Sequence, residues 1–184
     1  MNQTAENLRF LLWKQKKPRE HWATELARMA SCTEHRAEKL LQGSALTTAE
    51  QKAIAQLAHC QEEDIQSARF LGEEVNVLFE NIRFLTDKKI TGITGKEMAS
   101  AIGVTEVTLS RWKNRKQTPE ANQLARLCQF LHISPRIDLK SEAIFLSSSP
   151  IGDFMRRQWL RQQIEEIDSQ TLRDLFPALE RMFK

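Results

Sequence analysis

The sequence predicts an all-α protein built from two tandem five-helix modules and a C-terminal amphipathic helical tail. The first observation is composition: Ala, Leu, Glu, Gln, Lys and Arg dominate the 184 residues, and Tyr is absent. The second is that apolar residues recur at helical spacing along most of the chain. The third is an internal repeat. With 41% hydrophobic residues, the chain can bury one or two compact cores.

The internal repeat consists of three segments that return in the same order. Asn7-Leu8-Arg9-Phe10-Leu11 returns as Asn81-Ile82-Arg83-Phe84-Leu85, and Leu26-Ala27, Ala30-Ser31 and Thr33-Glu34 return as Met98-Ala99, Ile102-Gly103 and Thr105-Glu106. Ile54-Ala55-Gln56-Leu57 returns as Leu124-Ala125-Arg126-Leu127. Chance similarity between Leu- and Ala-rich helices is the alternative, and the shared order argues against it. We therefore expect module 1 at 1–72, module 2 at 75–146 and the tail at 153–184.

Each element of module 1 has a local signal. Helices are expected near 5–15, 19–30 and 33–42, with Gly43 ending the third. Thr47 and Glu50 form a capping box for a fourth helix, and a fifth is expected near 62–71. Gly72-Glu73-Glu74 and residues 147–152 are the expected linkers.

Module 2 centres on residues 94–116, which predict two short helices joined by a tight turn. Met98 and Ile102 lie on the apolar face of the first helix, and Gly103 ends it where a left-handed residue is required. Thr105 is the expected N-cap of the second helix, which runs to about Asn114 with Leu109 and Trp112 facing inward. Thr118-Pro119 is expected to open the next helix, with Pro in its first position.

These positions together resemble the helix-turn-helix of the Cro and phage-repressor (XRE-type) family. The resemblance covers roughly 75–145 and is carried by Met98-Ala99, Ile102-Gly103-Val104, Thr105, Leu109-Ser110-Arg111-Trp112, Thr118-Pro119, Leu124, Ala125, Leu127 and Leu131. It implies lambda-repressor-like modules and a repressor or activator that binds an operator. The family often has Gln at the start of its second helix as a phosphate contact. Here Gly95 takes that position, and Lys96 next to it can replace the contact.

The outer face of the helix Thr105–Asn114 holds the candidates for reading base edges: Glu106, Val107, Ser110 and Arg111. Arg111 can donate two hydrogen bonds to guanine, Glu106 can accept one from cytosine, and Val107 can meet a thymine methyl. The phosphate candidates are Lys96, Thr105, Lys113, Asn114, Arg115 and Lys116. The alternative for the charged residues is a solvated helix face. Trp112 is expected in the core and not as a stacking platform.

Module 1 presents a second candidate DNA site on the matching helix, formed by Thr33, Glu34, His35 and Lys39. Glu34 and Glu38 nearly balance the cations there, so this face predicts either a weak reader or a packing or partner surface. The sequence leaves both interpretations open.

The tail, 153–184, predicts a helix near 153–167 followed by a second amphipathic segment. Leu172, Leu175, Leu179 and Met182 recur at helical spacing beside Phe176 and Phe183, and Pro177 should break or kink the chain after Phe176. A hairpin of this size cannot bury both apolar faces alone. Homodimerisation through 153–184 is the favoured interpretation; packing on module 2 and a heterologous partner are the alternatives.

Several functions are disfavoured by what the sequence lacks. It has no nucleophile elbow, phosphate loop or metal motif, so no enzyme, metal or cofactor is expected. Cys128 and His132 have metal-pair spacing, but a core cysteine is the preferred interpretation. Three widely spaced cysteines predict a reduced, cytoplasmic setting, and no apolar run is long enough for a membrane span.

The function predicted is sequence-specific regulation of transcription at double-stranded DNA. The alternative is a protein-interaction module, such as an antitoxin or polymerase-associated factor, that uses the helix-turn-helix as a scaffold and the tail as its partner site. Non-specific nucleoid binding is a third candidate, and the modest net charge of +3 disfavours it.

Overall fold

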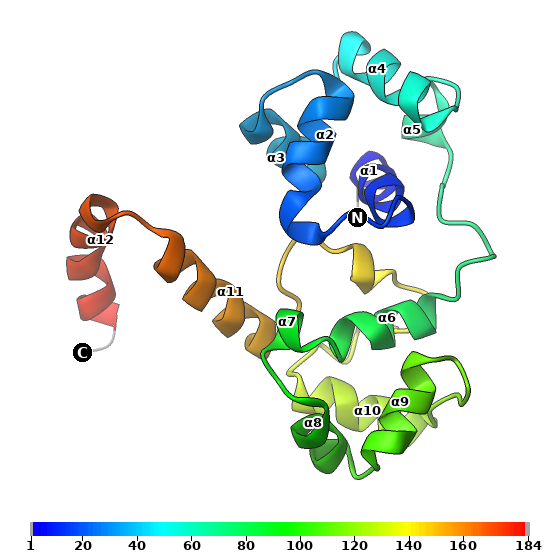
Figure 1. The fold of residues 1–184 in the computed structure, drawn as a ribbon, viewed down its shortest axis with the longest axis vertical. Coiled ribbons are helices and arrows are strands. Elements are labelled where there is room, and N and C mark those ends of the chain that lie inside the picture. Colours follow the sequence, from blue (N-terminus) through cyan, green and yellow to red (C-terminus); the bar gives the residue numbers. More distant parts are fainter. Residues whose placement is uncertain (1, 183–184) are drawn as a thin grey trace. The chain divides into compact units, whose positions relative to one another are not determined.

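The computed structural model describes residues 2–182, which form helices, turns and loops without a strand. The expected all-α class is therefore confirmed. Figure 1 shows the helices in chain order. Two groups of chain segments form separate compact units. The first contains the residues up to Glu80 together with Leu139–Ser149, and the second contains Asn81–Asp138 and the residues from Pro150 onward.

The first unit is built from α1 (Gln3–Lys14), the 3-10 turn η1 (Arg19–His21), α2 (Trp22–Ala30), α3 (Glu34–Gln42), α4 (Thr48–Ala58) and α5 (Asp64–Ser67). Helix α2 packs against α3 and α4, while α1 packs against α5. Fully buried side chains from every one of these α-helices fill the core: Leu8, Leu12, Leu26, Leu40, Ile54 and Ile65. The Thr47–Glu50 capping box at the start of α4 is present as expected.

The segment Leu139–Ser149 closes the first unit as a strap that contains the 3-10 turn η2 (Ile144–Leu146). The Phe145 ring lies 5.0 Å from the Trp13 ring of α1. Arg9 Nη1 donates to Ser148 Oγ at 3.0 Å, and Arg19 Nη1 donates to the Ser147 carbonyl at 2.7 Å. Burial and the nearby Arg9 charge lower the pKa of Arg19 to about 10. The sequence placed residues 139–146 at the end of module 2 and residues 147–149 in the following linker, and the linear division at 72 and 146 stays a prediction.

The second unit contains most of α6 (Val77–Leu85), then α7 (Lys88–Thr91), α8 (Gly95–Ile102), α9 (Glu106–Lys113) and α10 (Ala121–Phe130). Helix α8 packs against both α9 and α10. Its core is made by Ile82, Leu85, Met98, Ile102, Trp112 and Leu127, which are all fully buried. This is the part of the fold that positions the candidate interface.

The two units share local geometry at matching positions. Ser31 after α2 and Gly103 after α8 are both left-handed, with φ of 53° and 73°. Gly43 after α3 and Arg115 after α9 are also left-handed. The contacts of α2 with α3 and α4 match those of α8 with α9 and α10. These likenesses support the tandem five-helix modules, which remain a prediction.

The tail forms α11 (Asp153–Glu166) and α12 (Ser169–Met182). The first turns of α11 belong to the core of the second unit, since Met155 is buried and the Phe154 ring lies 5.3 Å from Phe130. Gly152 passes so close to the Leu131 carbonyl that a Cβ atom there would collide with it. Helix α12 has no buried residue. Phe183, which the sequence assigned to its apolar face, lies outside the described residues.

Two helix boundaries correct the expectations drawn from proline. The sequence predicts a break or a kink after Phe176. Helix α12 continues through Pro177, so the chain does not break there, and the kink stays a prediction. An interior proline costs a helix about 3 kcal/mol, which means that α12 is weakened and not ended there. Helix α10 begins at Ala121 with Glu120 as its N-cap, so Pro119 precedes the helix and is not its first residue. The backbone N–H of Glu120 donates to Gln123 Oε1 at 2.8 Å, which fixes this start.

The fifth helix of the first unit is also shorter than expected. Helix α5 covers only Asp64–Ser67, because the backbone becomes extended at Ala68. None of the helices formed by residues 2–182 combines the length and the apolar character that crossing a membrane requires.

Candidate nucleic-acid interface

Helices α8 and α9 are fixed by caps on both sides of their turn. Thr94 Oγ1 accepts from the Glu97 N–H, and a Glu97 carboxylate oxygen accepts from the Thr94 N–H at 2.9 Å, which forms a capping box at the start of α8. These hydrogen bonds hold the pKa of Glu97 below its usual value. Gly103 then turns the chain with φ of 73°, and the Val104 N–H donates back to the Ala99 carbonyl at 2.9 Å. The turn therefore has a single well-defined geometry.

Helix α9 has one buried face and one free face. Leu109 and Trp112 face inward with 3% and 0% exposure, whereas Val107 is 61% exposed. Thr105 is the N-cap, since its hydroxyl accepts from the Thr108 N–H at 3.1 Å. The predicted inward positions and N-cap are thus where the sequence placed them.

The candidate base-reading residues gather on the free face. Glu106, Val107, Ser110 and Arg111 are all exposed, as the 3.6-residue period requires. The structure brings these four side chains together with two phosphate candidates around one depression in the surface, lined by Glu106, Val107, Ser110, Arg111, Asn114 and Lys116. A short helix with such a face has the size that a major groove admits.

The basic residues Lys113, Arg115 and Lys116 at the C-terminal end of α9 form its cationic exit, and a Schellman motif fixes the backbone there. The Lys116 N–H donates to the Arg111 carbonyl at 2.8 Å, and the Arg115 N–H donates to the Trp112 carbonyl at 3.0 Å. Arg115 adopts φ of 58°, a conformation that costs a non-glycine residue about 1 kcal/mol. The Asn114 amide caps the same turn by donating to the Ser110 carbonyl at 2.9 Å. In this state Asn114 serves the helix end and does not point a free amide at a ligand.

The remaining phosphate candidates flank α9. Lys96, Arg115 and Lys116 are exposed and Lys113 is half-buried. Lys96 lies in the first turn of α8, where backbone N–H groups and the helix dipole also favour a phosphate. The Thr105 hydroxyl is already in use as the N-cap and lies 3.0 Å from the Thr108 hydroxyl.

Two further lysines of the second unit extend this surface and were missed by sequence reasoning. Lys88 and Lys89 of α7 are both exposed. Lys88 lies close enough to α8 to contribute to the lowered pKa of Glu97. The signal that reveals them is regional charge. Residues 81–138 contain ten Lys and Arg against five Asp and Glu, whereas the first unit contains eleven against thirteen. The net charge of the whole chain conceals this contrast.

The second candidate site, on α3, has ordered geometry without a positive field. Thr33 caps α3, and its hydroxyl accepts from the Arg36 N–H at 3.2 Å. Glu34, His35 and Lys39 are exposed, and His35 Nδ1 lies 3.8 Å from a Glu38 carboxylate oxygen. The exposed charges of this face nearly cancel, so α3 lacks a cationic exit like that of α9.

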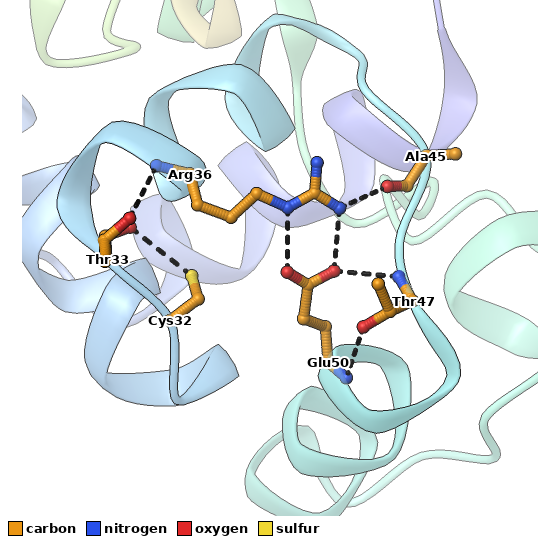
Figure 2. A network of polar contacts seen from close by, with 6 residues as sticks. All are labelled: Cys32, Thr33, Arg36, Ala45, Thr47 and Glu50. Atoms are coloured by element: carbon orange, nitrogen blue, oxygen red, sulfur yellow. Dashed lines mark hydrogen bonds and ion pairs between the residues drawn. The ribbon is translucent and has the colours of Figure 1, made fainter.

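Figure 2 shows what holds α3 in place. The Arg36 guanidinium donates to both carboxylate oxygens of Glu50, at 2.8 and 2.9 Å, and to the Ala45 carbonyl. Glu50 also accepts from the Thr47 N–H at 2.8 Å. The hydrogen bonds from Arg36, together with those of Thr47, lower the pKa of Glu50 to about 2. This network is structural, because Arg36 is committed to Glu50 and is not available for a ligand.

The capped α8–turn–α9 pair, with its free outer face and cationic exit, forms a helix-turn-helix. Comparison with known proteins agrees: residues 83–136 match the family model of the Cro/C1-type HTH DNA-binding domain. This match, which covers less than a third of the chain, supports a DNA-binding regulator as the general class of protein. The searches of curated proteins and of solved structures each found no match. Within residues 2–182 no group of three or more His, Cys, Asp or Glu side chains is placed to hold a metal ion.

Proposed function

We propose that this protein is a sequence-specific transcription regulator that inserts the outer face of α9 into the major groove of double-stranded DNA. The observation that carries the proposal is the grouping of Glu106, Val107, Ser110 and Arg111 around one exposed depression on a helix whose opposite face is buried. The Cro/C1-type match covers this segment. Sequence is read at base edges and affinity comes from phosphates, and both kinds of side chain are present here.

Each side chain has a distinct proposed role. Arg111 donates two hydrogen bonds to guanine, a contact worth about 1–3 kcal/mol of discrimination. Glu106 accepts from cytosine and repels phosphate, so it penalises incorrect sites. Lys116 and Arg115 neutralise phosphates at the exit of α9. Lys96, with Lys88, does the same at the start of α8.

The other parts of the chain have supporting roles in this proposal. The α3 face of the first unit acts as a packing or partner surface because its charges cancel. The tail joins two copies into a homodimer, so that one complex contacts two half-sites. We propose further that the protein acts in the cytoplasm, as a repressor or activator, without enzymatic activity or cofactor. An antitoxin-like or polymerase-associated scaffold is not favoured, since the domain match is to a DNA-binding class.

A salt-dependent titration of the full chain against genomic duplex fragments tests the proposal. Arg111→Ala should lower the preference for the best fragment by about 5- to 150-fold while retaining non-specific binding. Lys116→Ala should weaken all sequences alike and reduce the slope of log K against log salt by about 0.9. Lys39→Ala is the matched control, because Lys39 occupies the position of Arg111 in the first unit. Binding no tighter than to competitor DNA, or an Arg111→Ala protein with unchanged preference, overturns the proposal.

A further inference from the structure

Helix α11 leaves an apolar stripe uncovered beyond its first turns. Trp159, Leu160 and Ile164 are 49%, 51% and 51% exposed. At 100° per residue they occupy one sector of the helix, which also includes Ile167 at its end. Phe154, which packs on Phe130 in the core of the second unit, lies on a different sector. Met155 is buried and lies one turn before Trp159, so the stripe begins next to the anchoring residues and is uncovered from Trp159 onward.

Four charges of α11 are placed unfavourably for the helix on its own, although Asp153 in the first turn is favourably placed and pairs with Arg156. Cations favour the C-terminus of a helix and anions its N-terminus. Here Arg157 and Arg161 lie in the first two-thirds, and Glu165 and Glu166 lie in the last turn. Arg157 and Arg161 are also a like-charged i, i+4 pair, which is destabilising. Within residues 2–182 neither arginine has an ion-pair partner, nor does Glu165.

The apolar residues of the stripe and the charged residues beside it are arranged symmetrically about the same point of α11. Trp159 and Ile167 lie equally far on either side of residue 163, and Leu160 and Ile164 are similarly placed about residue 162. Arg161 and Glu165 are also equally spaced about residue 163 and share one border of the stripe. If a twofold axis passed through this point, each residue of such a pair would lie next to the other member of the pair in the second copy.

We infer that α11 pairs antiparallel with α11 of a second copy of this chain, around an axis near Gln162 and Gln163. The two stripes cover each other, and Arg161 of each copy meets Glu165 of the other. In an antiparallel pair related by a twofold axis, the same edge of the apolar stripe comes together in both helices. Arg161 and Glu165 both lie along that edge, so each can meet the other in the second copy. This deepens the homodimer of the proposed function by naming its helix, its orientation and its contacts.

A second copy fits this surface better than DNA does. The region from residue 150 onward has six cations and six anions, so it carries no positive field for phosphates. Glu165 and Glu166 on the exposed last turn would repel a phosphate backbone. Helix α12 completes the interface, because a stable one buries about 800 Å² per partner and α11 is only about 21 Å long. Its exposed Leu175, Phe176 and Met182 supply that further apolar area.

The test is sedimentation equilibrium of the full chain without DNA. The wild type should be a dimer. Arg161→Glu should raise the dimer dissociation constant about tenfold or more, because like charges then face each other at both symmetry-related contacts. Glu165→Arg should do the same. Both substitutions in one chain should restore dimerisation, since an antiparallel pair then regains its opposite-charge contacts.

Disulfide trapping reports the orientation independently. Gln163→Cys lies at the axis and should cross-link to its own copy on oxidation. Arg156→Cys should not, because an antiparallel pair separates the two copies of that position by about 21 Å. The inference is overturned by a monomeric wild type, by single charge variants that do not weaken the dimer, by a double variant (Arg161→Glu with Glu165→Arg) that stays weak, or by cross-linking at both positions. Far-UV circular dichroism confirms that each variant is folded, and DNA titration of the same proteins separates failure of this interface from failure of DNA binding.

Discussion

Glu50→Gln tests whether the network in Figure 2 holds α3 onto α4. The Glu50 side chain is 10% exposed and that of Arg36 is 30% exposed, so solvent screens this pair only in part. The pKa of Glu50 is lowered from 4.5 to about 2. A shift of one pKa unit corresponds to about 1.4 kcal/mol, so the ionised form is favoured by about 3 kcal/mol in the folded state. Partial screening reduces this, and we expect Glu50→Gln to cost about 1–3 kcal/mol at pH 7.

The pH dependence has a definite sign. A carboxylate with a lowered folded-state pKa stabilises the protein above its unfolded pKa and loses that contribution as pH falls through the folded value. The difference in unfolding free energy between wild type and Glu50→Gln should therefore be full at pH 7. It should shrink from about pH 4.5 down to about pH 2. Urea unfolding at a series of pH values measures this difference.

A matched control comes from the second unit. Glu97 has the same place in its capping box as Glu50 but no arginine partner among the described residues. Glu97→Gln should cost much less than Glu50→Gln, because Gln also serves in a capping box. Equal losses for the two variants, or a Glu50→Gln difference that does not change with pH, would refute the assignment of the lowered pKa to the Arg36 contact.

Three further outcomes are expected. Trp112→Ala should lower the unfolding free energy measured in urea by about 3–5 kcal/mol, since this side chain is fully buried. Trp112→Phe should cost less, because Phe keeps most of the buried volume and removes a buried indole N–H that has no hydrogen-bond partner among the described residues. Gly103→Ala should cost about 1–2 kcal/mol in the same assay, because φ is 73° and the new Cβ would lie 2.8 Å from Arg126 Nη1. Glu106→Gln should tighten binding to random duplexes more than to the preferred site, as competition titration would show, and a selective loss of random binding would contradict this.

The sequence predicts the α8–α9 region well because its signals are local. The inward places of Leu109 and Trp112 follow from the 3.6-residue period. The N-cap at Thr105 and the left-handed turn at Gly103 follow from the chemistry of single residues. The cluster of Glu106, Val107, Ser110 and Arg111 then follows by geometry. What those side chains contact remains a prediction.

The elements that the sequence misses depend on partners far along the chain. The strap Leu139–Ser149 joins the first unit through Arg9, Arg19 and Trp13, more than a hundred residues away, and its own pattern carries no sign of them. Proline rules were also too strong. They place a helix start at Pro119 and a break or kink at Pro177. The Glu120–Gln123 cap instead starts α10 at Ala121, and α12 continues through Pro177.

The most direct measurement places a photo-reactive benzoyl-phenylalanine at Val107 of the full chain and maps its cross-links on a bound duplex. Val107 is 61% exposed at the front of α9, so the label should not disturb the fold. The proposal predicts cross-links to base atoms that face the major groove, confined to one or two neighbouring base pairs. The same label at His35, the matching position of α3, should give none. A Val107 label that reaches no base, or a His35 label that reacts equally well, would contradict the central role of α9.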